Sequence, residues 1–523
     1  MDDNKIIKRA LISVSDKKGI VELGQQLQKM GVEIISTGGT LKILKDAGVQ
    51  VVSISSFTGS PEILDGRVKT LHPKVHSGIL FRRDDESHID QMSKSDYKPI
   101  DLVVVNLYPF IETVAREDAT HEEIIENIDI GGPSMIRSAA KNHNDVTVVV
   151  DPADYDNLVD LLDENEGVTT LEFRRECAKK AFELTSVYDT AIAEYFVSGK
   201  KEETEQFHET VNLNLKKKSS LRYGENPHQE AAVYKLENYQ APSLINAEIL
   251  AGKELSYNNY GDLDAALGML LDFEEPFACV LKHANPCGAA TGSTIAKAYK
   301  DAYDSDPLSA FGCIIGLNKE VDLACAEVLH ETPFVECMLA PSFTEDAFKL
   351  LKKKKSRRLL ALPAILNGRQ KDQITYKYIS GGFLLQTADD YLVSVEDLKV
   401  VTNRKPTDAE IKSLMFGWKV VKHTKSNAIV LTKGNATVGV GMGQTSRVDS
   451  GFMAVKRAGD RAKGAVMASD AFFPMADGLE VAAEAGVTAV IQPGGSKGDE
   501  AVIEAANKFD IAMVFTGNRH FKH

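Results

Sequence analysis

The sequence has little of several features that would point to other classes of protein. Only six cysteines occur in 523 residues and no two form a Cys-x-x-Cys pair, so we expect free thiols in a reducing compartment. No run of about 18 apolar residues is present, which argues against a membrane-spanning helix. The first residues, MDDNKIIKRALISVSDKKG, lack the apolar core and cleavage site of a signal peptide. We therefore expect a cytoplasmic protein with no membrane partner.

The sequence also lacks an excess of positive charge. Lys and Arg together number 61 against 75 Asp and Glu, which gives a net charge of -14, so general nucleic-acid binding is not expected. An acidic chain can still bind anions through local Lys, Arg and backbone N–H groups. The length allows two to four domains, and a hydrophobic content of 43% predicts an ordinary globular protein with a sizeable core.

The first 150 residues alternate apolar runs with amphipathic segments. We expect strands in residues 10–15, 32–36, 51–55, 101–110 and 145–150, with helices between them. Continuous Val and Ile runs separated by helices predict a parallel sheet that is covered on both faces. In such sheets ligands bind at the carboxyl ends of the strands.

A polar stretch divides the chain after a long helical pattern that covers residues 171 to about 197. The stretch SGKKEETEQFHETVNLNLKKKSS is typical of an interdomain linker and predicts a boundary near residue 200. Residues 219–523 again show an α/β pattern. The dipeptide Lys-His follows an apolar run twice there, at 282–283 and at 422–423, which a duplication or chance would explain equally well.

The segment CVLKHANPCGAATG, residues 279–292, is a candidate active site, and three chemistries come into question. A zinc deaminase needs a Glu two residues after its His and a Pro-Cys-x-x-Cys motif, and both are missing. Cys287 could be a nucleophile with His283 as its base, although a lone Cys in a glycine-rich turn is more often structural. Lys282 and His283 fit proton transfer better, because an adjacent cation favours the neutral imidazole that accepts a proton. In the alternative interpretation the two residues have no catalytic role, the lysine lying at the surface and the histidine being hydrogen-bonded.

Two loops near the N-terminus predict a phosphate site. SVSDKKG (13–19) and STGGT (36–40) each place hydroxyls, glycine N–H groups and a helix start at a strand end. One such loop is common, whereas two at successive strands favour a single pocket. GRVKTLHPKVH (66–76) adds Arg and Lys side chains. IDIGGPSMIRSAAKNH (128–143) adds a helix start that could hold an oxyanion and a lysine that could donate a proton.

Together these motifs resemble a known family. SVSDKKG, STGGT, GRVKTLHPKVHSGIL, NLYPF and DIGGPSMIRSAAKNH are similar, in this order, to the cyclohydrolase part of the bifunctional AICAR transformylase/IMP cyclohydrolase family. RYGENPHQ, LKHANPCGAATG, KHTKSNAIV, GMGQTSR, SDAFFP and NRHFKH resemble its transformylase part. The resemblance covers the chain from about residue 10 to its last residue.

The resemblance implies two consecutive reactions of purine biosynthesis. A formyl group passes from 10-formyltetrahydrofolate to AICAR, and the product, FAICAR, closes to IMP with loss of water.

The resemblance further implies a methylglyoxal-synthase-like cyclohydrolase domain in residues 1–200, with its core in 1–150. A transformylase domain in residues 201–523 would contain two cytidine-deaminase-like α/β modules without a catalytic metal, the two Lys-His stretches being relics of their duplication. By analogy we expect a homodimer. In an alternative interpretation, the first domain is a nucleotide sensor that regulates a single-activity transformylase.

The resemblance also implies roles for individual residues. His283 would take the amine proton, Lys282 would stabilise the transition state, Asn427 would hold the carboxamide, and Lys141 would transfer protons in the cyclohydrolase site. Further transformylase residues would be Arg222, Tyr223, Gly312, Glu336, Arg447, Phe472, Ser496 and Arg519. The cyclohydrolase pocket would contain Ser15, Asp16, Lys17, Thr37, Gly38, Gly39, Thr40, Arg67, Lys69, Thr70, Asn106, Tyr108, Asp129, Ile130 and Gly131.

Overall fold

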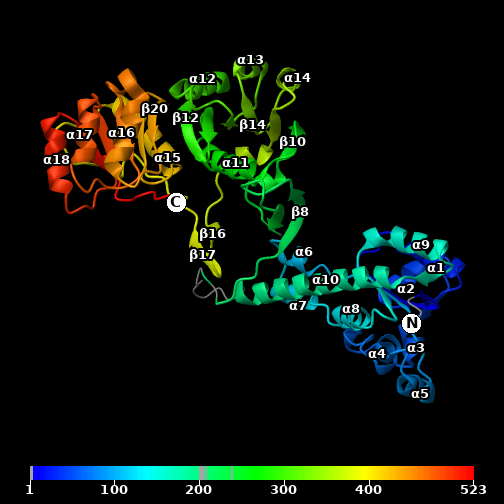
Figure 1. The fold of residues 1–523 in the computed structure, drawn as a ribbon. Coiled ribbons are helices and arrows are strands. Elements are labelled where there is room, and N and C mark those ends of the chain that lie inside the picture. The colour runs from blue at the N-terminus through cyan, green and yellow to red at the C-terminus, as the bar shows by residue number, and fades with distance from the viewer. Residues whose placement is uncertain (1–3, 199–206, 208, 237–238) are drawn as a thin grey trace. The chain divides into compact units, whose positions relative to one another are not determined.

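The chain forms two compact units, Met1–Asn212 and Leu213–His523 (Figure 1). The computed structural model describes residues 4–198, 207, 209–236 and 239–523. The predicted boundary near residue 200 lies outside these described residues. None of the described helices has both the length and the apolar composition that crossing a bilayer requires.

The first unit is built on a five-stranded sheet in which all neighbouring strands are parallel. Its strand order is β4 (Val51–Ser53), β3 (Glu33–Ser36), β2 (Arg9–Ser13), β5 (Leu102–Val105) and β6 (Thr147–Val149). Strands β3, β5 and β6 are almost wholly buried, as continuous Val and Ile runs predict. The expected strand at 51–55 is shorter because a helix begins after its third residue.

Helix α1 (Ile20–Lys29) shows how the sequence determines an element of this unit. Ile20, Leu23 and Leu27 recur on one helix face and are all buried against the sheet. Gly31, with φ of +79°, follows the helix in the left-handed conformation that glycine adopts without strain.

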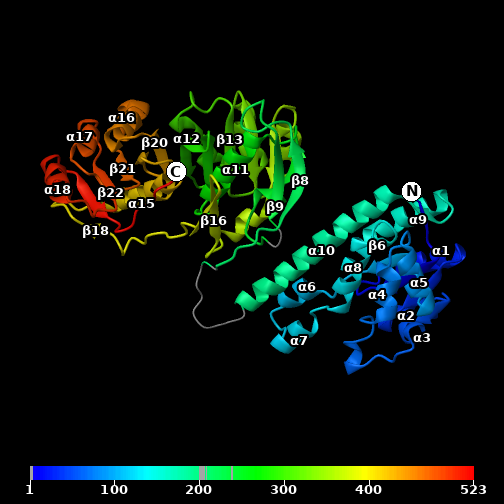
Figure 2. The ribbon, with the colours of Figure 1, turned by 60° about the horizontal axis from the view of Figure 1, so that its bottom comes forward.

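Several helices and short strands complete the first unit. The helices are α2 (Gly38–Asp46), α3 (Ile54–Thr58), α4 (Pro73–Leu80), α5 (Glu86–Lys94), α6 (Phe110–Val114), α7 (His121–Glu126), α8 (Gly131–Lys141), α9 (Tyr155–Glu164) and α10 (Leu171–Ser198), and β1 (Lys5–Ile6) pairs with β7 (Val168–Thr169). The long helix α10, which the sequence predicted, runs along α8 and α6 (Figure 2).

The second unit contains the same order of elements twice. The first module consists of α11 (Tyr257–Leu270), β11 (Phe277–Lys282), β12 (Asn285–Thr291), α12 (Ile295–Ser305), β13 (Cys313–Leu317), α13 (Leu323–Glu331), β14 (Val335–Ala340), α14 (Glu345–Leu351) and β15 (Arg358–Ala361). The second module consists of α15 (Asp408–Lys422), β19 (Ile429–Lys433), β20 (Ala436–Gly441), α16 (Arg447–Ala458), β21 (Val466–Ser469), α17 (Asp477–Glu484), β22 (Ala489–Gln492), α18 (Asp499–Lys508) and β23 (Ala512–Phe515).

The two modules share one twelve-stranded sheet and lie next to each other in Figures 1 and 2. The strand order is β10 (Glu248–Ala251), β15, β14, β13, β11, β12, β20, β19, β21, β22, β23 and β18 (Lys399–Val400). The modules join where β12 pairs with β20 in antiparallel orientation.

Side chains at matching positions support an internal duplication. Ser256 caps α11 and Thr407 caps α15, each with a complete capping box. Gly288 and Gly439 each lie so close to a carbonyl of the following helix that a Cβ would collide with it. The members of each pair are separated by the same number of residues.

The repeated Lys-His dipeptide is not the mark of this duplication, contrary to the expectation from the sequence. Lys282 and His283 lie at the end of strand β11, whereas residues 422–423 lie at the end of helix α15. At the interval that relates the modules, the counterpart of Lys282 is Lys433, which ends β19. The second dipeptide therefore arose at an unrelated position.

Two hairpins stand apart from the large sheet. β8 (Leu215–Leu221) pairs with β9 (Ala231–Leu236), and β16 (Ile374–Ile379) pairs with β17 (Gly382–Thr387). The β8 residues were predicted to belong to a linker because they are polar. That prediction is wrong, because these residues pair with β9 in a two-stranded ribbon although nearly all of them are exposed.

Candidate active sites

A cavity of about 730 Å³ lies in the first unit at the carboxyl ends of β2, β3 and β5. The starts of α2 and α8 contribute to its wall, and ligands of parallel sheets bind at this edge. The predicted cyclohydrolase residues that line the cavity are Ser15, Lys17, Thr37, Gly38, Gly39, Thr40, Arg67, Lys69, Thr70, Asn106, Tyr108, Asp129, Ile130 and Gly131.

The cavity also contains residues that the sequence did not single out. These are Ser13, Val14, Gly66, Val105, Ile125, Glu126, Ile128, Gly132 and Met135. Most are chain neighbours of the motif residues, which is the only signal that could have identified them. Ile125 and Glu126 are different, because they come from α7, and Glu126 forms an exposed ion pair with Arg67.

Backbone N–H groups at the start of α2 form an end of the cavity suited to an anion. Thr37 is the N-cap of α2, but its side chain makes no capping hydrogen bond, so the first N–H groups of the helix remain available. A Cβ on Gly38 would lie 3.9 Å from Lys69 Nζ, and one on Gly39 would lie 3.9 Å from Lys17 Cε. Two lysines beside a helix N-terminus fit a phosphate group.

The first loop has a different role from the one that we expected. The N–H groups of Ser15 and Asp16 donate to Asn106 Oδ1 at 2.5 and 2.9 Å, and Asn106 Nδ2 donates to the Asp16 carbonyl at 3.1 Å. These N–H groups hold Asn106 at the end of β5 and are not available to a phosphate. The Asp16 side chain accepts the N–H of Lys18, and Asp16 does not line the cavity.

Asp129 lies at the start of α8, on the cavity wall. Its carboxylate accepts the Gly132 N–H at 2.8 Å. Burial raises the pKa of Asp129, while the bond from Gly132 and the nearby Lys69 lower it. The Asp129 N–H donates to the Tyr188 hydroxyl at 2.8 Å, and that hydroxyl donates to the Asn127 carbonyl at 2.8 Å. Tyr188 of α10, for which the sequence predicted no role in the site, therefore holds the loop that carries Asp129.

Lys141 lies in the last turn of α8, at the opposite end from Asp129. A helix of 11 residues spans about 15 Å, and Lys141 is exposed and absent from the residues that line the cavity. The structure therefore does not place Lys141 in the cavity, whereas the sequence-based hypothesis requires it to lie there. The cavity lysine whose charge acts on Asp129 is Lys69.

In the second unit, a two-residue turn joins β11 to β12. His283 and Ala284 form the turn, with φ of +53° and +58°, and Lys282 pairs with Asn285 across its base. Lys282 Nζ donates to the Phe311 carbonyl at 2.9 Å, and the His283 side chain is exposed. The turn thus exposes an imidazole and fixes an ammonium group beside it.

The second module reaches this turn through the loop that precedes β19. The Lys425 N–H donates to Asn285 Oδ1 at 3.1 Å. Two residues later, Asn427 Oδ1 accepts Arg447 Nη2 at 2.8 Å. Arg447 also forms an ion pair with Asp470, a fully buried residue of the SDAFFP motif. The sequence predicted no role for Asp470. The predicted residues Asn427 and Arg447 are therefore in direct contact, and their loop is joined to the Lys282–His283 turn.

Five of the seven remaining predicted transformylase residues lie along the same edge of the twelve-stranded sheet. Gly312 precedes β13, and Glu336 lies at the start of β14, where it pairs with Arg358 at 3.3 Å. The pairing directions place these strand starts beside the end of β11. Phe472, Ser496 and Arg519 follow the ends of the parallel strands β21, β22 and β23, beside the start of β19. Arg222 lies over the Tyr223 ring at 5.7 Å in the segment that follows β8.

Cys287 is not suited to nucleophilic catalysis. It is 7% exposed, and burial raises the pKa of its thiol to about 11. A thiol that stays protonated near neutral pH is a poor nucleophile.

The second Lys-His pair belongs to a buried ion cluster. Asp272 accepts Lys422 Nζ at 3.0 Å and the His423 Nε2 at 2.7 Å, and Arg369 Nε donates to its other oxygen at 2.5 Å. Burial opposes ionisation of Asp272, but these partners outweigh it and hold its pKa well below the usual range. Burial lowers the pKa of His423 to about 4, although Asp272 acts in the opposite direction.

This cluster predicts that stability falls as the pH is lowered from 7 to 5. In the unfolded chain a histidine binds a proton below about pH 6.5, while His423 in the fold stays neutral down to about pH 4. Protons therefore favour the unfolded state in this window, by about 2 kcal/mol at pH 5. Urea unfolding at both pH values tests this, with His423→Gln as control. A loss of the same size in that variant would contradict the assignment to His423.

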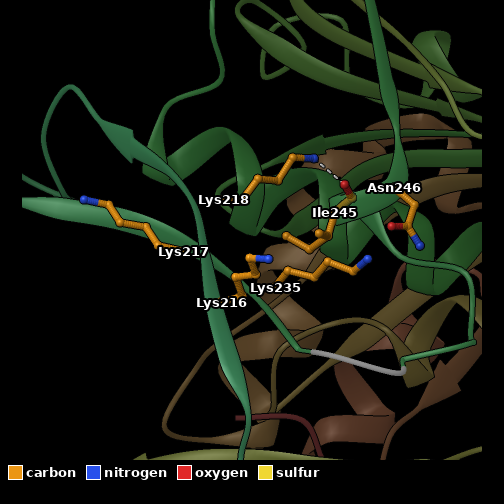
Figure 3. Close-up of a pocket in the computed structure, with 6 residues that line it drawn as sticks. All are labelled: Lys216, Lys217, Lys218, Lys235, Ile245 and Asn246. Atoms are coloured by element: carbon orange, nitrogen blue, oxygen red, sulfur yellow. Dashed lines mark hydrogen bonds between the residues drawn. The ribbon is translucent and has the colours of Figure 1, made fainter. Parts of the chain in front are cut away.

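A smaller cavity, of about 300 Å³, lies beside the β8–β9 hairpin (Figure 3). It is lined by Lys216, Lys217, Lys218, Lys235, Ile245 and Asn246. Lys218 donates to the Ile245 carbonyl, whereas Lys217 points away from the other lysines in Figure 3. None of the predicted transformylase residues lines this cavity.

Comparisons with known proteins show which families the chain resembles. Residues 19–134 match the MGS-like domain family, and residues 139–457 match the family described as AICARFT/IMPCHase bienzyme. Proteins named "Bifunctional purine biosynthesis protein PurH" from Acetivibrio thermocellus, Anoxybacillus flavithermus and Bacillus subtilis are 52%, 54% and 53% identical to this chain. Each alignment covers 99% of this chain and 100% of the relative. A solved structure, "Crystal structure of ForH", is 38% identical over 36% of this chain and 99% of its own, with a TM-score of 0.33.

The family match supports the bifunctional interpretation over that of a nucleotide sensor attached to a single-activity enzyme. The predicted fold class is confirmed by the parallel five-stranded sheet of the MGS-like part and by the α/β second unit. This chain belongs to the AICARFT/IMPCHase bienzyme family.

Proposed function

We propose that residues 201–523 transfer a formyl group from 10-formyltetrahydrofolate to the 5-amino group of AICAR, and that residues 1–200 close the product, FAICAR, to IMP. The observation that supports this division most strongly is that each unit has its own set of candidate groups. The cavity of the first unit contains Lys69 and Asp129, and the second unit presents Lys282 and His283 on a turn. We further propose that the enzyme is cytoplasmic, which its six free thiols support.

In formyl transfer, the amine nitrogen of AICAR attacks the formyl carbon and must lose a proton. The exposed imidazole of His283 is the base that takes this proton. The Lys282 ammonium, held by the Phe311 carbonyl, stabilises the oxyanion and protonates the departing folate nitrogen. Asn427 and Arg447, already in contact with each other, orient the carboxamide and other polar groups of the nucleotide. Because the amine is weakly nucleophilic, its orientation contributes as much as the base does.

In ring closure, the carboxamide nitrogen of FAICAR attacks the formyl carbon within the same molecule. Asp129, whose burial raises its pKa, accepts the proton that this nitrogen loses. The former formyl oxygen takes one proton from Lys69, rather than Lys141, and a second from Asp129, which had received it from the carboxamide nitrogen. The oxygen then leaves as water, while the proton that the formamide nitrogen loses returns to Lys69. Lys17 and the start of α2 hold the phosphate, and Lys69 lies close to both this part of the cavity and Asp129.

A coupled assay tests this assignment. The purified chain is supplied with AICAR and 10-formyltetrahydrofolate, and the products are separated and quantified. We expect IMP to form with little accumulation of FAICAR. Accumulation of FAICAR without IMP would instead support the sensor alternative, in which the first unit binds a nucleotide without transforming it.

We propose that the enzyme is a homodimer, and the β16–β17 hairpin supports this. The hairpin extends away from both modules in Figure 1, and Tyr378 and Phe383 on it are 71% and 50% exposed. An isolated two-stranded ribbon is only marginally stable, and exposed apolar side chains that lie together mark interaction surfaces. Light scattering should give twice the 57.1 kDa of the chain, and replacing both residues with serine should shift the mass towards the monomer. A monomeric parent protein at micromolar concentration would contradict the proposal.

A further inference from the structure

The turn that carries His283 has a backbone conformation that its sequence does not favour. Both central residues, His283 and Ala284, are in the left-handed region, as in a type I′ hairpin turn. Such turns usually contain Asn-Gly or Asp-Gly, because left-handed backbone crowds a Cβ, and alanine has no polar group to compensate. Something outside the turn must therefore hold it.

Asp262 of α11 is placed to do this. Its Oδ1 accepts the Ala284 N–H at 2.6 Å, a charge-assisted hydrogen bond to one of the two left-handed residues. Asp262 is partly buried, and its charge is close enough to interact with that of His283. Its other charged neighbour is Glu336, which pairs with Arg358 at 3.3 Å. The Asp262 carboxylate, on helix α11, thus holds the turn by a direct hydrogen bond.

The second module provides an internal comparison. At the interval that relates the modules, the counterpart of His283 is Gly434, with φ of +62°, and the counterpart of Asp262 is Ser413. Glycine adopts this conformation without help. The Ser413 side chain contacts strand β19 instead, at 3.1 Å from Thr432 Oγ1. Only the module whose turn carries an imidazole has a carboxylate bonded to that turn.

We propose that Asp262 is a positioning residue for formyl transfer, which fixes the left-handed His283–Ala284 turn and thereby aims the imidazole at the amine of AICAR. This proposal rests on the proposed role of His283 as the base. Asp262 acts through the turn and need not touch the substrate. Its loss therefore reduces kcat and leaves the KM for AICAR nearly unchanged, because misplacing a reacting group by a fraction of an ångström already slows the chemical step.

The test compares variants of the full-length enzyme in the formyl-transfer assay. Asp262→Ala should lower kcat about 10- to 100-fold with a KM within about twofold of the parent value. Asp262→Asn retains an oxygen that can accept the Ala284 N–H and should recover most of the loss. Adding Ala284→Gly to Asp262→Ala should also recover part of it, because glycine needs no support in this turn. Ser413→Ala, at the matching position of the second module, should leave kcat within about twofold of the parent value.

His283→Ala, measured in parallel, separates this proposal from the one on which it rests. A parent-like rate in that variant would refute the role of His283, and with it any action of Asp262 through His283. A large loss in His283→Ala together with a parent-like kcat in Asp262→Ala would refute only the role of Asp262. Equal losses in Asp262→Ala and a folded Asp262→Asn would also refute it, since the hydrogen bond to the turn would then not be what matters. If Asp262→Ala does not fold, Asp262→Asn and the double variant decide the question.

Discussion

Replacing His283 with alanine is expected to lower the kcat of formyl transfer about a thousandfold, because a positioned general base contributes that order of rate enhancement. The amine of AICAR would then have to lose its proton to water. Cyclisation of supplied FAICAR should continue at the parent rate, since His283 belongs to the second unit and the cavity with Asp129 belongs to the first. The two rates are measured separately, by folate release and by IMP formation.

The internal repeat offers a matched control for replacing Lys282, the neighbour of His283. Lys433 occupies the position in the second module that Lys282 occupies in the first, and its Nζ donates to the Lys463 carbonyl at 3.0 Å. Lys282→Met should reduce formyl transfer strongly, whereas Lys433→Met should not. If Lys433→Met were as damaging as Lys282→Met, the loss could not be assigned to the chemistry of the first turn.

The second large effect is expected in the first unit, from Lys69→Met. This change removes a positive charge close to both Asp129 and the start of α2, while it keeps most of the side-chain volume. Cyclisation should fall about a hundredfold, because both the phosphate and the leaving oxygen lose a stabilising cation. Formyl transfer should be unaffected. FAICAR cyclisation followed by absorbance gives the rate directly.

Lys141→Met is the comparison that distinguishes the structural proposal from the one based on the sequence. Lys141 is exposed in the last turn of α8, so its loss should change cyclisation by less than about threefold. If Lys141→Met abolished cyclisation and Lys69→Met did not, the proton donor would have to be reassigned to Lys141.

The predictions from sequence succeeded where the structure of a short segment is determined by the residues of that segment alone. Strands β2 and β5 are continuous apolar runs, so their burial and parallel pairing follow from pattern alone, although the strand predicted at 101–110 already ends at Val105. The loop STGGT was recognisable because the helix start that it forms lies next to its strand in the chain. For the same reason most of the expected cyclohydrolase residues line the cavity.

The predictions failed where the role of a residue depends on distant partners. The residues around Asp262 do not predict its hydrogen bond with the Ala284 N–H. Those around Asn285 do not predict that a backbone N–H of the second module donates to its side chain. The buried Asp470 likewise needs Arg447 from another element to explain it. The position of Lys141 is a different case, because the rise of an 11-residue helix already separates it from Asp129.

The most direct test of the central claim, that two separate sites carry consecutive reactions, is to mix two inactive variants. His283→Ala alone and Lys69→Met alone should each make almost no IMP from AICAR and 10-formyltetrahydrofolate. Mixed in one vessel, they should restore IMP formation, because FAICAR released by the Lys69→Met enzyme is cyclised by the His283→Ala enzyme. A mixture that forms no IMP, although the Lys69→Met enzyme accumulates FAICAR and both proteins are folded, would contradict the account.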